Sequence, residues 1–192
     1  MLIVAALSLS GDVLSSNFTA HRAAAEAGDP VAQINLGRDF AKGLGTNRNF
    51  TAAAYWYRQA ADAGHPRGQS NYGFLLSVGQ GVKQDLALAA DYYRKSAEAG
   101  DAEGQNKLGS AYSRGRGVEQ DFAKAREWYV LAAEQGHVGS TFNLALLYDN
   151  DKGTVTHDYE QRKQAAAGLY RKAAKLGHIG AHYNLVSGAE RA

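Results

Sequence analysis

The chain has 192 residues, with 21 lysines and arginines against 19 aspartates and glutamates, which gives a formal net charge of +2. This near balance argues against a nucleic-acid-binding surface, which would carry a clustered excess of positive charge. The chain contains no cysteine, which excludes disulfide bonds and thiolate metal sites. The localisation therefore stays undecided between the cytoplasm and a periplasmic or secreted location.

Residues 2–10, LIVAALSLS, form an apolar run at the start of the chain. One interpretation is the core of a secretory signal, although no lysine or arginine precedes it. The run is far too short to span a membrane, so no integral membrane segment is expected. The second interpretation is an eroded first helix, because Val4 precedes Phe40 by the 36-residue spacing described next. Residues 1–28 are thus either a signal remnant or a degenerate first half-repeat.

From residue 29 onward, the chain is organised by a repeated spacing of glycines. The steps between the glycines that end successive repeats are 36, 36, 36 and 41 residues, at Gly28, Gly64, Gly100, Gly136 and Gly177. A period of this length predicts stacked repeats that form a solenoid. The predicted organisation is one continuous solenoid domain, with repeats at 29–64, 65–100, 101–136 and 137–177 and a C-terminal capping helix at 178–192.

Each repeat contains two predicted helices joined by a glycine turn. In the third repeat, the first helix has small, leucine and aromatic residues on one face, at Gly104, Leu108, Gly109 and Tyr112. The turn contains Gly115 and Gly117, which allow the left-handed backbone of a tight reversal. The second helix has an apolar face at Phe122, Ala125, Tyr129, Ala132 and Ala133.

Three glycines inside the first helices, Gly37, Gly73 and Gly109, need a compensating gain in packing. A glycine inside a helix costs about 1 kcal/mol relative to alanine. We expect the compensation to be a close approach of the second helix, with alanines on the facing side.

The residues that follow the terminal glycines are predicted to cap the first helices. They are Asp29, His65, Asp101, His137 and His178. A shared metal site at the three histidines is not expected, because successive repeats would separate them by about 10 Å. His178 and His182 are four residues apart and could chelate a metal, but no carboxylate pair accompanies them, so no metal or other cofactor is predicted.

The fourth repeat differs from the others in two ways. Its turn, Asp149 to Gly153, resembles a calcium loop only weakly, since no bidentate glutamate follows at the required distance. We interpret it as a variant turn. Its five extra residues are expected either to lengthen that turn or to extend the second helix by about one turn.

The order of motifs LGxxY, GxGV, D, KA, WY, AA and G is similar to the Sel-one-like repeat, a relative of the tetratricopeptide repeat. The resemblance covers about residues 29 to 185. It implies an all-α fold, a right-handed α/α superhelix or solenoid of antiparallel helix pairs. It also implies a binding or adaptor role and no catalytic activity.

The expected function is therefore a non-enzymatic scaffold that binds a peptide or partner protein in a concave groove lined by the first helices. The sequence contains no GxSxG, HExxH or phosphate-loop motif, so a hydrolase is less expected. The alternative is an exported regulator that binds an envelope or host partner, as many bacterial members of the family do. A monomer without bound nucleic acid is expected.

By analogy with the tetratricopeptide repeat, the groove would be lined by residues two before and two after the leucine of each first helix. These are Ile34, Arg38, Ser70, Phe74, Asn106, Ser110, Phe142 and Leu146, with Tyr183 from the capping helix. Their residue types vary while their neighbours repeat, as a recognition surface requires. The alternative is that Phe74, Phe142 and Leu146 pack between repeats.

Overall fold

The computed structural model describes residues 15–155 and 158–189, and these residues form helices joined by short turns. After a helix over 15–26, the helices are α2 (Pro30–Lys42), α3 (Phe50–Asp62), α4 (Pro66–Val78), α5 (Leu86–Glu98), α6 (Ala102–Arg114), α7 (Phe122–Glu134), α8 (Val138–Asp149), α9 (Tyr159–Lys175) and α10 (Ile179–Ala189). No strand occurs among these residues. Both interpretations of residues 2–10 concern a segment outside the described residues.

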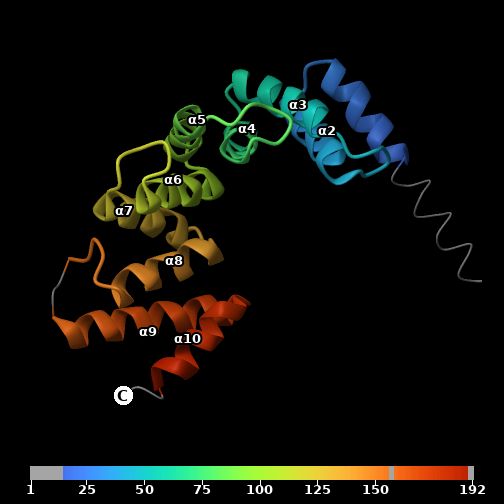
Figure 1. Cartoon of the computed structure of the whole chain (residues 1–192). Helices are drawn as coiled ribbons and strands as arrows, with labels where there is room; N and C mark the ends of the chain where they lie inside the picture. The colour runs from blue at the N-terminus through green and yellow to red at the C-terminus, as the bar shows by residue number, and fades with distance from the viewer. Residues whose placement is uncertain (1–14, 156–157, 190–192) are drawn as a thin grey trace, which may run out of the picture. The chain divides into compact units, whose positions relative to one another are not determined.

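The chain divides into two compact bodies, Met1–Tyr92 and Tyr93–Ala192, with the boundary inside α5. In the first body α2 packs against α3, and in the second α6 packs against α7 and α8 against α9 (Figure 1). The prediction of an all-α fold built from consecutive helix pairs is confirmed. The hand of the superhelix stays a prediction.

The predicted helix caps form at four of the five expected positions. The carboxylates of Asp29 and Asp101 accept hydrogen bonds from the amides of Val31 and Gly104, each at 2.8 Å. The Nδ1 atoms of His137 and His178 accept from amides three residues onward, at 3.0 and 3.2 Å. His65 occupies the same backbone position but makes no side-chain capping bond, so the prediction is wrong there.

The helices of one pair approach closely at a glycine, but the facing residue is a tyrosine rather than the expected alanine. A Cβ atom placed on Gly37 would lie 2.7 Å from the ring of Tyr57. Alanine instead faces the glycine at the start of the following first helix, since a Cβ on Gly68 would lie 2.7 Å from the Cβ of Ala60. The sequence predicts the close approach correctly and assigns it to the wrong side chain.

The insertion in the fourth repeat lengthens the second helix. Helix α9 has 17 residues, whereas its counterpart α7 has 13. The turn before it carries Asp151 with a φ of 55°, at the position that Gly115 occupies one repeat earlier. Asp149 pairs with Lys163 and Asp151 with Arg162, so the carboxylates of this variant turn bind cationic side chains of α9.

Candidate partner-binding surface

In the first body, the predicted groove residues fall into a buried pair and an exposed pair. Ile34 and Ser70 are only 6% and 2% exposed. One helical turn further along, Arg38 is exposed on α2 and Phe74 is 41% exposed on α4. Arg38 and Phe74 hold the same position in successive first helices, and they are the exposed members of this set in the first body.

The charge of Arg38 lies beside a buried carboxylate. Its Nε atom is 3.9 Å from Oδ1 of Asp39, which is itself buried. The other oxygen of Asp39 pairs with Nδ1 of His21 at 2.5 Å. Burial raises the pKa of the nearby Tyr57 to about 12, with Arg38 acting against the rise and Asp39 adding to it. Because the carboxylate of Asp39 lies near the guanidinium of Arg38, it competes with any acidic group of a partner for Arg38.

In the second body, Asn106 is already occupied by contacts between first helices. Its Oδ1 atom accepts hydrogen bonds from Oγ of Ser140 at 3.0 Å and from Nδ2 of Asn143 at 3.2 Å. These bonds join α6 to α8. Ser110, one turn along α6, is half-buried beside Tyr129. Both side chains are therefore engaged within the second body.

Phe142 packs between helices. This agrees with the alternative prediction for Phe142, in which it packs between repeats instead of lining a groove. Its ring stacks on the ring of His178 with the centroids 4.0 Å apart and the planes 18° apart. The ring of Tyr170 lies 5.7 Å away on α9. Leu146 packs against the same buried cluster, which includes Ala145 and Tyr170. The groove assignment in this body therefore depends on Tyr183, which is 73% exposed.

Glu103, at the start of α6, forms a network of charged and hydrogen-bonded side chains that the sequence analysis does not predict. The carboxylate of Glu103 is 2.9 Å from Nε2 of His137 and 2.9 Å from Nζ of Lys107. The hydrogen bond from His137 is the main cause that lowers the pKa of Glu103 to about 2. The four-residue spacing of Glu103 and Lys107 could have indicated half of this network. The contact with His137 joins two repeats and has no local signal.

Among the described residues, no three histidine, cysteine, aspartate or glutamate side chains come together as a metal ion would require. The Nδ1 atom of His178 is used as a helix cap, and its ring stacks on Phe142. No described helix is both long enough and apolar enough to cross a membrane.

A family model described as the Sel1 repeat matches residues 30–65, 66–101, 102–137 and 139–178. A search of curated proteins found no match.

Three solved structures are similar to this chain. One is c5321, a protective antigen present in uropathogenic Escherichia coli strains that displays an SLR fold, with 37% identity and a TM-score of 0.78. Another is a Sel1 repeat protein from Oxalobacter formigenes, with 33% identity and a TM-score of 0.79. The cysteine rich protein B of Helicobacter pylori shares the fold at 24% identity and a TM-score of 0.52.

The first two matches cover 87% and 88% of this chain. This chain spans only 35% of the first protein and 65% of the second. The third match covers 70% of this chain and 92% of the other.

Proposed function

The chain belongs to the Sel1 repeat family, whose fold is typical of protein-interaction scaffolds, and from this premise we propose that it is a monomeric, non-enzymatic adaptor. Its ligand is a peptide or a partner protein that lies across the first helices. Proteins of this family are generally non-catalytic repeat proteins, which supports the non-enzymatic assignment.

One observation carries the proposal, the exposure of Phe74 in an otherwise buried stretch of α4. Its neighbours Tyr72 and Leu75 are buried, whereas Phe74 is 41% exposed. Large aromatic and arginine side chains dominate the binding energy of many interfaces. The neighbouring Arg38 holds the corresponding position on α2. We assign Arg38 and Phe74 as the partner-binding surface of the first body, and Tyr183 on α10 as a separate contact surface of the second body.

The experiment compares photo-crosslinking from two exposed aromatic positions of the first body. Benzoylphenylalanine is placed at position 74 on a first helix or at position 55 on a second helix, where Tyr55 is 56% exposed. The protein is then irradiated in the cells that produce it. A discrete crosslinked partner is expected from position 74 only, and the Phe74→Ser variant should no longer capture that partner.

Equal crosslinking from both positions, or capture that survives Phe74→Ser, would contradict the assignment. The exported regulator remains the alternative for the same surface. It differs in the location of the partner and depends on residues 2–10, which lie outside the described residues.

A further inference from the structure

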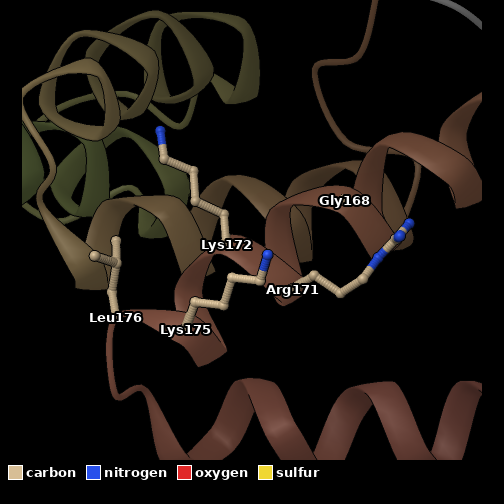
Figure 2. A pocket seen from close by; sticks show the side chains of 5 residues that line it. All are labelled: Gly168, Arg171, Lys172, Lys175 and Leu176. Atoms are coloured by element: carbon tan, nitrogen blue, oxygen red, sulfur yellow. The ribbon is translucent and has the colours of Figure 1, made fainter.

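A shallow basic pocket lies on the C-terminal half of α9. It is lined by Gly168, Arg171, Lys172, Lys175 and Leu176 (Figure 2). The spacing of three, one and three residues places the four residues within α9 on one helical face, and Leu176 follows directly after the helix. The buried residues of α9 lie at other positions, Ala166, Tyr170, Ala173 and Ala174. The pocket is thus on the side of α9 that does not pack into the core.

All the charged side chains that line the pocket are basic. Arg171 and Lys175 are four residues apart, a spacing at which like charges destabilise a helix by a few tenths of a kcal/mol. Figure 2 shows the Lys172 side chain extending away from α9, and its Nζ atom donates to the carbonyl of Ala133 at 3.2 Å. The helix dipole favours cations in the last turn. The dipole does not account for Lys175, because the other second helices carry an acidic residue at the corresponding position.

The other repeats place an acid where this one has Lys175. The corresponding residues are Asp62, Glu98 and Glu134. In α3 the acid forms an ion pair, with Nε of Arg58 3.4 Å from Oδ2 of Asp62. In α9 the arginine is retained at Arg171, but the acid is replaced by a second cation. The repeat frame therefore does not require a lysine at this position.

The glycine that opens the pocket is also a departure from the repeat. The residues that correspond to Gly168 are Tyr55, Asp91 and Glu127. No atom lies within 4 Å of a Cβ placed on Gly168, so packing does not demand a glycine there. A glycine inside a helix costs about 1 kcal/mol relative to alanine. Gly168 and Lys175 are thus both departures from the repeat that cost stability. Together they make the surface open and positively charged.

We propose that this surface binds an acidic peptide segment of a protein partner. Arginine can hold a carboxylate through two parallel hydrogen bonds, and Lys175 adds a second charge one turn away. Leu176 is 46% exposed beside these cations and would contact an apolar side chain of the same peptide. That apolar contact favours a peptide over an inorganic anion. The site goes beyond the proposed function, since it lies on a second helix.

The test measures binding of a fluorescein-labelled peptide, Glu-Leu-Glu-Glu-Leu-Glu, to the full chain by fluorescence anisotropy. The key variant is Lys175→Glu, which restores the arginine and acid pairing that α3 has at Arg58 and Asp62. It should weaken binding by at least about tenfold, because the substitution removes an attractive charge and adds a like charge that repels the acidic peptide. Its melting temperature should change little, because removal of the like-charge pair with Arg171 offsets the loss of a cation from the last turn.

The matched control is Lys83→Glu, which makes the same charge change at an exposed position of the first body. It should alter binding by less than about twofold if only long-range charge is affected. Equal losses in both variants would overturn the proposal, as would equal binding of the neutral peptide Gln-Leu-Gln-Gln-Leu-Gln. Displacement of the peptide by inorganic phosphate at an equal concentration would instead identify an anion site and reject the peptide assignment.

Discussion

Gly109 lies against the ring of Tyr129, so that a Cβ atom placed on Gly109 would be 2.8 Å from Cδ1 and Cε1 of that ring. The backbone oxygen of Ala125 would lie 3.2 Å away. The same relationship joins Gly37 to Tyr57. A first helix and its second helix therefore meet where a glycine of one faces a tyrosine ring of the other.

We predict that Gly109→Leu lowers the free energy of unfolding by well over 1 kcal/mol, because the added side chain overpacks against Tyr129. Chemical denaturation measures the change. Gly168→Ala is the matched control, since nothing lies near its Cβ position. It should raise stability by up to about 1 kcal/mol through helix propensity. An unchanged midpoint for Gly109→Leu would show that the two helices do not meet there.

The unequal caps lead to a second prediction. Asp101→Ala should cost about 1 kcal/mol, because it removes the acceptor for the amide of Gly104. His65→Ala should cost less than about half of that, since His65 makes no capping bond. Thermal unfolding of the two variants gives the comparison. Similar losses at both positions would mean that the capping bond of Asp101 contributes little.

The lowered pKa of Glu103 predicts a specific acid sensitivity. The folded-state pKa of about 2 lies below the ordinary value of 4.5, so the ionised form stabilises the fold. This stabilisation is fully present above about pH 5 and is lost as the pH falls toward 2. Because Glu103 is partly exposed, screening should reduce its contribution to about 1 kcal/mol.

The measurement is the urea midpoint at pH 6 and at pH 3. Glu103→Gln should lose less stability between these pH values than the original chain does. Glu127→Gln changes an exposed carboxylate and should leave the pH dependence unaltered. An identical acid response in the original chain and in Glu103→Gln would refute the role of Glu103.

Replacement of Phe142 should lower stability, whereas replacement of Phe74 should remove partner binding. Phe142→Ser removes the stack on His178 and the contact with Tyr170, and it should cost about 2 kcal/mol or more. Phe74→Ser should shift the melting temperature much less and should abolish partner capture. If Phe142→Ser melts like the original chain, the packing assignment fails. If Phe74→Ser still captures the partner, the binding assignment fails.

Local features were predictable from the sequence because they depend on nearby residues. The helix pairs follow from residue spacing, and the caps at Asp29 and Asp101 follow from residue type next to a glycine. From the sequence we expect alanine opposite Gly37, whereas the structure has Tyr57 there. Residue spacing alone does not set the rotation of one helix against another. The burial of Ile34 and the bond from His137 to Glu103 depend on how repeats stack, which leaves no trace in a single repeat.

The greater length of α9 has a geometric consequence for the connection that enters it. Its four additional residues rotate the start of the helix by about 400°, which is within about 40° of one full turn, and move it by about 6 Å along the axis. The chain from α8 can therefore still enter on nearly the same side. Two additional residues would rotate the entry by about 200° and bring the connection to the opposite side of the helix. Insertions at this point should be accepted in steps of three or four residues.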